Sequence, residues 1–301
     1  MVAPPYYPPR RRSFLFKLFV VALIIAAIAA IAALVDHYNM TNNAHRRIGI
    51  ARLEGTIEEY DKLGSWLEKL RKDPHIRAVL LRIDSSGGTV AASQELFDAV
   101  RRLNQIKPVV VSMGDSAASG AYYAALGARH IVANPSTITG SIGVKMILPD
   151  FTRLMEKIGV SEITVASGAM KDAGSPFRGI TPEEHSYFES LITDLHEQFV
   201  SDVADVRKMS AEDVARLADG RAFTGRQALE LGLVDSLGTF TDAMNILCSM
   251  LSISDPVYVE QPKPDLPLLD YVISLIAGKV NLKLPADLSR NGLSPVFLYL
   301  H

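Results

Sequence analysis

Short apolar runs alternate with amphipathic stretches from Ile48 onward, and this alternation constrains the fold more than any other feature of the sequence. The runs "IGIARLEG", "IRAVLLRID", "KPVVVSM" and "HIVAN" have the length and composition of buried strands. Between them, "KLGSWLEKLRKD" and "AASQELFDAVRRL" carry apolar residues at helical spacing, and "AASGAYYAALGA" is interpreted as a third helix. Consecutive βα units of this kind predict an α/β fold with a mostly parallel sheet and crossover helices.

The later part of the chain is predicted to be mainly helical. Thr181, Pro182 and Glu184 have the pattern of a helix start: a capping residue, a proline at the first helical position and a glutamate that completes a capping box. An apolar stripe at three- and four-residue steps extends this helix to about Lys208. Two shorter helices are expected to begin at Ser210 and Thr224.

An apolar segment near the N-terminus predicts a membrane anchor. Residues 18–35 contain no charged or strongly polar side chain, and as a helix they span about 27 Å, enough to cross a hydrocarbon core. Four basic residues and no acid lie within residues 1–17, so the positive-inside rule places that head in the cytoplasm and the rest of the chain outside. The alternative is a signal peptide cleaved near Ala32 and Ala33. We favour an uncleaved anchor because the run exceeds a signal core of roughly 7–15 residues.

The predicted organisation has five parts. They are a cytoplasmic basic head (1–17), a transmembrane helix (18–35), a polar tether (36–47), a folded domain (48–250) and a C-terminal extension (251–301). The extension ends in "GLSPVFLYLH", which is nearly all apolar and too short to span a bilayer. We therefore expect it to dock on the core, on a partner subunit or on the membrane surface.

Composition excludes several classes of function. The net charge is -2, and outside the basic head no basic stretch is interleaved with aromatic residues, so nucleic-acid binding has no support. The single cysteine, Cys248, excludes an intrachain disulfide and any multi-cysteine metal site. The stretch "HEQFV" lacks the second histidine of a zinc-binding helix. We expect neither a metal nor a cofactor.

Two stretches at predicted strand ends carry candidate chemistry. The loop "DSSGG" follows a buried strand, and its backbone N–H groups suit a phosphate or an oxyanion, although a plain turn capped by Ser85 or Ser86 fits as well. Ser119 lies among small residues at the end of the next strand. Because successive parallel strands end at one edge of a sheet, the loop and Ser119 should flank one crevice. Ser119 is either a nucleophile or a helix cap.

A serine nucleophile needs a base, and the seven histidines lie in the tether, in turns, near the polar face of the long helix or at the terminus. A lysine can serve if it is neutral. Lys171 lies in "VASGAMKDAGSPFRG", where small neighbours favour burial but Asp172 favours the charged form; a solvated loop lysine is the alternative. Ser141 in "TITGSIGV" is either a hydroxyl that holds the lysine amine or a turn serine.

Together these stretches resemble the signal peptide peptidase A family, membrane-anchored serine proteases with a Ser/Lys dyad whose fold is related to Clp protease and the crotonases. The resemblance runs from about Ile48 to Met250. It is carried by "IDSSGGTVAASQEL", "GDSAASGAYYAA", "NPSTITGSIGV", "SGAMKDAGSPFR" and "DGRAFTGRQALELGLVD", in the family's order.

The resemblance implies a role for each candidate residue. Ser119 would be the nucleophile, Lys171 the general base and Ser141 the residue that orients the lysine. The backbone N–H groups of Gly88 and Gly120 would form the oxyanion hole. The first loop departs from the family's usual Ser/Thr-Pro-Gly-Gly, since Ser86 stands in place of the proline and leaves the turn less restricted in φ.

The resemblance also implies partners and location. The chain has one Ser/Lys set and so is similar to the short members of the family, which form homo-oligomeric rings whose dyad is completed between neighbouring protomers. Its domain would lie on the outer, periplasmic or extracellular side of the cell membrane and cleave apolar peptides such as released signal peptides. The apolar composition of the C-terminal stretch, rather than the resemblance, suggests that it packs on a neighbour or enters a substrate groove as a mimic of an apolar peptide.

Two alternatives to a peptidase remain open. A crotonase-type acyl-CoA enzyme would share the fold, but its acid/base carboxylates have no clear counterpart and an exported domain would meet little acyl-CoA. A non-catalytic membrane scaffold would use the same fold only to form an oligomer.

Overall fold

The computed structural model describes residues 14–44, 46–261 and 297–299 of the chain, which divides into two units, Met1–Arg46 and Arg47–His301. The first unit contains the helix α1 (Phe14–Ala44). Within it, Phe16–Leu34 is long and apolar enough to cross a membrane by length and composition. The helix continues through most of the stretch expected to be a tether.

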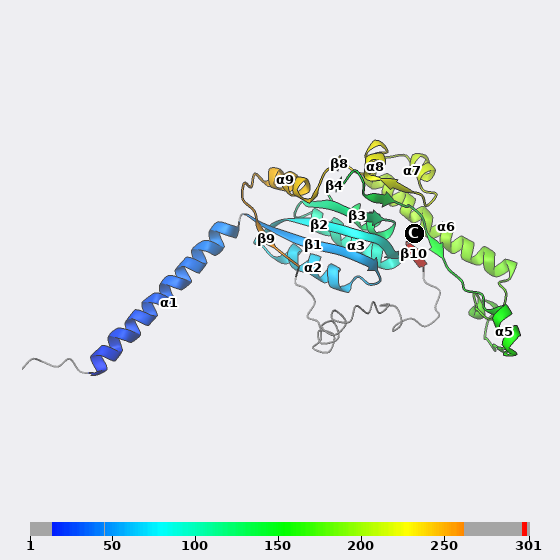
Figure 1. Cartoon of the computed structure of the whole chain (residues 1–301), viewed down its shortest axis with the longest axis horizontal. Coiled ribbons are helices and arrows are strands. Elements are labelled where there is room, and N and C mark those ends of the chain that lie inside the picture. The colour runs from blue at the N-terminus through cyan, green and yellow to red at the C-terminus, as the bar shows by residue number, and fades with distance from the viewer. Residues whose placement is uncertain (1–13, 45, 262–296, 300–301) are drawn as a thin grey trace, which may run out of the picture. The chain divides into compact units, whose positions relative to one another are not determined.

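The second unit is built on a sheet whose central pairs are parallel. β1 pairs with β2, β2 with β3, β3 with β4 and β4 with β8, and β9 lies on the outer side of β1. This arrangement confirms the predicted α/β class (Figure 1). The strands are β1 (Arg47–Ile57), β2 (Ile76–Thr89), β3 (Val109–Ala118), β4 (His130–Ala133), β8 (Ser236–Leu237) and β9 (Val257–Val259).

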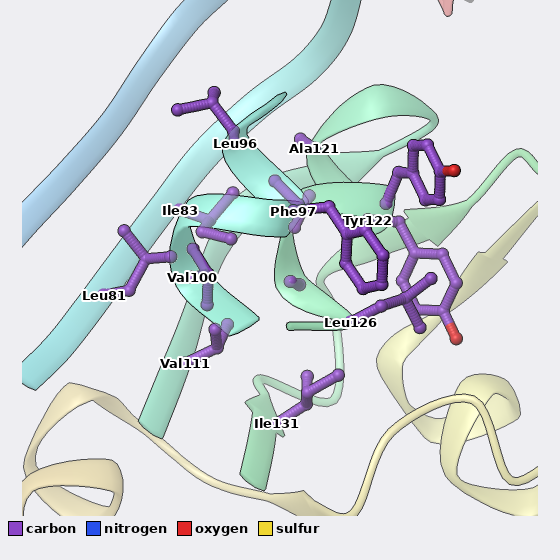
Figure 2. Packing of buried hydrophobic residues seen from close by; sticks show 14 of the residues in the cluster. Leu81, Ile83, Leu96, Phe97, Val100, Val111, Ala121, Tyr122, Leu126 and Ile131 are labelled. Atoms are coloured by element: carbon purple, nitrogen blue, oxygen red, sulfur yellow. The ribbon is translucent and has the colours of Figure 1, made fainter. Parts of the chain in front are cut away.

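Apolar side chains on both faces of the strands explain why helices cover both sides. On one face, alternate strand residues pack under α2 (Asp61–Lys72), α3 (Val90–Asn104) and α4 (Gly120–Ala125). Figure 2 shows Leu81, Ile83 and Val111 of this face beside Phe97 and Val100 of α3. On the other face, Ile50, Leu80 and Val110 pack against α9 (Phe240–Leu251).

Three of the remaining helices begin at the capping residues predicted from the sequence. Thr181 and Thr224 form capping boxes at the starts of their helices, and the Ser210 side chain accepts a hydrogen bond from the Asp213 N–H. The elements between β4 and β8 are β5 (Ile138–Gly140), β6 (Lys145–Met146), α5 (Thr152–Ile158), the 3₁₀ helix η1 (Ala169–Asp172), α6 (Pro182–Arg207), α7 (Ala211–Leu217), β7 (Ala222–Thr224) and α8 (Gly225–Glu230).

Two predicted boundaries differ from the structure. The "SSGG" stretch is not a tight turn but the extended end of β2, because it pairs with the last residues of β1. The helix predicted over "AASGAYYAALGA" begins only at Gly120, because Ala117 and Ala118 pair with β5 as the end of β3. As a result, β2 and β3 are longer than predicted, and both extend to the edge of the sheet at which Ser119 lies.

A short strand from the C-terminus completes this edge. β10 (Phe297–Tyr299) lies between the end of β2 and β6 and is antiparallel to both. Tyr299 is paired with Gly88 and Phe297 with Met146. Of the three docking sites expected for the C-terminal stretch, its described residues 297–299 occupy the core of the same chain.

Candidate active site

Ser119 occupies a backbone conformation that side-chain-bearing residues rarely adopt. It is the N-cap residue between β3 and α4, with φ of 56° and ψ of -123°. Its side chain is 1% exposed, and its Oγ is a buried hydroxyl with no hydrogen-bond partner in the part of the chain that the structure describes. A serine with a strained backbone and an unpartnered buried hydroxyl lowers the stability of the folded state. Residues of this kind concentrate at functional sites.

Neighbouring strand β5 holds the Ser119 backbone in place. The Ser119 N–H donates to the Gly140 carbonyl at 2.7 Å, and Ala118 is in register with Gly140. Thr139 Oγ1 donates to the Ala117 carbonyl at 2.7 Å. These bonds restrain the backbone on which the Ser119 hydroxyl is mounted.

Asp84 contacts a bulge in β3 just before Ser119. The β2–β3 register passes from Ile83–Met113 directly to Ser85–Ala117, so residues 114–116 bulge out of the ladder. Asp84 Oδ1 accepts a hydrogen bond from the Ser116 N–H at 3.2 Å, and a Cβ on residue 114 would lie 2.9 Å from Asp84 Oδ2. A glycine at position 114 therefore lets the carboxylate support the bulge.

Gly88 lies at the end of β2, and Gly120 begins the helix that follows Ser119. The Ser85–Ala117 pair places the extended end of β2 beside the segment that leads to Ser119, as expected for one crevice. A Cβ on residue 88 would lie 1.9 Å from the Ile57 carbonyl oxygen, so this position requires glycine. Gly120 is the first residue of α4, directly after Ser119.

Ser141 lies at the end of the strand next to Ser119. It follows Gly140, has a positive φ of 50° and is 4% exposed. Its N–H donates to the Arg221 carbonyl at 3.0 Å, and its Oγ donates to the Gly220 carbonyl at 3.2 Å. Ser119 and Ser141 therefore lie at the same edge of the sheet, each directly after one residue of the register pair Ala118–Gly140.

A cavity of about 570 Å³ opens beside Ser141. Its polar lining includes Lys145, His196 and Asp219, and His196 Nε2 is buried without a hydrogen-bond partner among the described residues. Hydrogen bonds from Arg221 lower the pKa of the Asp219 carboxyl to about 2, so it is ionised at neutral pH. In the sequence, the contexts of the histidines do not indicate a base, and no motif marks Lys145. The sequence signal that could have indicated burial of His196 was its position next to the apolar stripe of its helix.

Lys171 does not reach Ser119 within one chain. It lies on η1 and is exposed, as expected for the solvated loop lysine of the two alternatives, and Ser119 Oγ has no partner among the described residues. The carboxylate of the neighbouring Asp172 is bound by Arg178 Nε at 2.8 Å. In Figure 1 the stretch with α5 lies beyond the first turns of α6, away from the sheet.

Other features add no competing site. A cavity of about 720 Å³ is lined mainly by residues 52–63 and contains none of the candidate residues. Across residues 14–44, 46–261 and 297–299, no group of three or more His, Cys, Asp and Glu side chains is arranged to hold a metal ion.

Comparison with known proteins identifies several similar sequences. The sequence profile of peptidase family S49 matches residues 101–252. A putative protease of Synechocystis is 48% identical over 215 residues, covering 70% of this chain and 75% of the relative. A putative signal peptide peptidase SppA of Enterococcus faecium is 35% identical over 195 residues, covering 64% of this chain and 57% of the relative.

Among solved structures, a mutant ClpP1 from Listeria monocytogenes aligns with a TM-score of 0.46 and 15% identity, covering 69% of this chain and 99% of ClpP1.

Proposed function

Because the chain belongs to peptidase family S49, we propose that it is a membrane-anchored serine endopeptidase with Ser119 as its nucleophile and Lys171 of a neighbouring copy as its general base. The observation that carries this proposal is the Ser119 hydroxyl, which is buried, unpartnered and mounted on a strained backbone at the edge of the sheet.

The chemistry follows from the groups around Ser119. A neutral lysine amine takes the hydroxyl proton as Oγ attacks the peptide carbonyl, and the carbonyl oxygen becomes an oxyanion. The N–H groups of Gly88 and Gly120 are the donors that stabilise it. The lysine ammonium then gives its proton to the leaving amine, and an acyl ester on Ser119 remains. Water, deprotonated by the lysine, hydrolyses that ester and regenerates the serine.

The separation of the two catalytic groups in one chain supports a dyad shared between copies. None of residues 143–183 is buried, and this stretch exposes Ile163 at 88% and Val165 at 95%. A second copy of the chain would cover these apolar side chains and bring Lys171 to the cavity beside Ser141. Ser141 would then direct the amine toward Ser119. A homo-oligomeric ring provides such a contact for every copy.

β10 supports an extended peptide as the substrate. It shows that three residues in extended conformation fit between Gly88–Thr89 and Lys145–Met146, with antiparallel pairing on both sides. A peptide added as a strand in this way gains backbone hydrogen bonds whatever its sequence. We propose that the natural substrates are unfolded apolar peptides, including released signal peptides.

The anchor supports the same class of substrate. Phe16–Leu34 can cross a membrane, and the basic residues before it favour a cytoplasmic N-terminus. The peptidase unit would then face the outer side of the cell membrane. Apolar peptides released at that surface would be within its reach.

Hydrolysis of an apolar fluorogenic peptide by the full chain in detergent tests this function. Ser119→Ala and Lys171→Met should each lower kcat by about a thousandfold or more, as expected for members of one catalytic unit. Lys157→Met, on the same exposed stretch, is the matched control and should keep wild-type activity. Loss of activity in Lys145→Met or His196→Ala, together with activity in Lys171→Met, would assign the base to the same chain. An oligomeric wild type that neither cleaves peptide nor reacts with a serine-directed phosphonate would favour a scaffold.

A further inference from the structure

The apolar contacts of the segment that carries Lys171, such as that between the Phe151 and Phe177 rings, involve partly buried side chains and no fully buried one. α5 has no buried residue, and none of residues 143–183 is buried. A base that must be placed to within a fraction of an ångström needs a rigid mount. Polar contacts must supply that rigidity within the chain.

Arg178 supplies these contacts through its whole guanidinium group. On the Lys171 turn, Nε donates to Asp172 Oδ2 at 2.8 Å and Nη2 donates to the Asp172 carbonyl at 2.7 Å. On α6, Nη2 donates to Glu184 Oε1 at 2.6 Å and Nη1 to Glu184 Oε2 at 3.0 Å. This planar group therefore ties the C-terminal end of η1 to the first turn of α6.

The acceptor on α6 is itself fixed. Glu184 is 4% exposed and accepts the Thr181 N–H at 2.9 Å, while its own N–H donates to Thr181 Oγ1 at 3.2 Å. Hydrogen bonds from Arg178 lower the pKa of the Glu184 carboxyl to about 2, so the pair stays ionised throughout the neutral range. Arg178 thus connects the exposed Lys171 turn to a capped helix.

The same contacts place a positive charge on the carboxylate nearest to Lys171 in sequence. An unpaired Asp172 would favour the ammonium form of Lys171, which cannot accept a proton. On η1 and the first turn of α6, the charged or titratable side chains are Lys171, Asp172, Glu183, Glu184 and His185. Of the acids among them, Asp172 and Glu184 are the ones that bind Arg178.

We propose that Arg178 is a positioning residue for the general base: it ties the Lys171 turn to α6 and shields Lys171 from the Asp172 carboxylate. This inference rests on the proposed function, in which Lys171 accepts the Ser119 proton. It assigns Arg178 a part in proton transfer without contact with the substrate.

The pH dependence of kcat/KM tests the shielding directly. Asp172→Asn is introduced into the wild type and into an Arg178→Met/Glu184→Gln background, in which the buried carboxylate is removed together with its partner. In the wild type we expect Asp172→Asn to leave the acid limb of the profile within about 0.2 pH units. In the double-variant background, the acid limb should lie about 0.5–1 pH unit higher than in the wild type. Adding Asp172→Asn to that background should bring the limb back to its wild-type pH. Equal effects of Asp172→Asn in both backgrounds would overturn the proposal.

Two controls separate the possible failures. Arg207→Met removes a comparable guanidinium that binds Asp235 at 2.8 Å, and it should change thermal stability but not the acid limb. Lys171→Met tests the premise. If that variant keeps wild-type activity and the same acid limb, the proposed function fails and this inference fails with it. If Lys171→Met is inactive but Arg178→Met/Glu184→Gln lowers kcat without moving the limb, Arg178 is only structural and the proposed dyad stands.

Discussion

Ser119 and Ser141 follow directly on two register-paired residues of neighbouring parallel strands, Ala118 and Gly140, and the Ser119 N–H donates to the Gly140 carbonyl at 2.7 Å. Both serines have a positive φ, 56° and 50°, and both are buried. The fold thus presents two hydroxyls side by side at one sheet edge at the expense of backbone strain. An arrangement of this kind is expected where one hydroxyl reacts and the other orients its base.

Replacing Ser119 by alanine should stabilise the protein while it abolishes activity. The substitution removes a buried hydroxyl without a partner, whose burial costs about 1–3 kcal/mol, so the Tm should rise by about 2–4 °C or more. Ser93→Ala is the matched control, because the buried Ser93 hydroxyl donates to the Thr89 carbonyl at 2.8 Å and its loss should lower the Tm. Differential scanning calorimetry compares the two. A fall in Tm for Ser119→Ala equal to that of Ser93→Ala would argue against stored functional strain.

Ser141→Ala should reduce catalysis more than stability. The Ser141 hydroxyl makes one 3.2 Å bond to the Gly220 carbonyl, so its loss costs about 1 kcal/mol, whereas a misdirected base lowers kcat by about 10–100-fold. KM should change little, since Ser141 does not hold the peptide. Steady-state kinetics with Ser116→Ala as the control measures this. An unchanged kcat in Ser141→Ala would remove Ser141 from the mechanism.

Gly88→Ala should disrupt the sheet as well as the proposed oxyanion hole. An added Cβ would lie 1.9 Å from the Ile57 carbonyl oxygen, and backbone in a paired strand cannot move away cheaply, so we expect a loss of about 3 kcal/mol or more and a clearly lower Tm. Gly179→Ala is the control because nothing lies within 4 Å of its added Cβ. If the Gly88→Ala variant keeps the wild-type Tm, the register between β1 and β2 is contradicted.

Removing residues 292–301 should expose the proposed substrate groove. β10 pairs with Gly88 and Thr89 on one side and with Lys145 and Met146 on the other, where an incoming peptide would pair. We expect the shortened chain to cleave a peptide faster at low substrate concentration, and to react faster with a serine-directed phosphonate. Size-exclusion chromatography shows in parallel whether the oligomer changes. Unaltered rates and oligomer size would mean that β10 does not occupy the groove in solution.

Local signals in the sequence predicted local structure well. The capping boxes at Thr181 and Thr224 are present, because a cap depends on residues three positions apart. The end of β2 was misjudged, since "SSGG" has turn composition and becomes a strand only through partners such as Ile57, 31 positions away. Composition cannot reveal that kind of pairing.

The candidate site was predictable only in part. Ser119 and Ser141 were singled out from small-residue stretches at strand ends, and the sheet register brings them together. The exposure of Lys171 agrees with the solvated loop lysine that the sequence left open, because small neighbours indicate burial only when something packs on them. The Arg178 contacts with Asp172 and Glu184 depend on how η1 meets α6, so no spacing rule predicts them.

Mixing two inactive variants tests the shared dyad most directly. Ser119→Ala and Lys171→Met chains are purified separately, shown to be inactive, then dissociated and reassembled together. If each site takes Ser119 from one copy and Lys171 from its neighbour, random assembly at equal amounts restores about a quarter of the wild-type activity per copy. If the dyad lies within one chain, or if Lys171 is not the base, the mixture shows no more activity than the two variants measured apart.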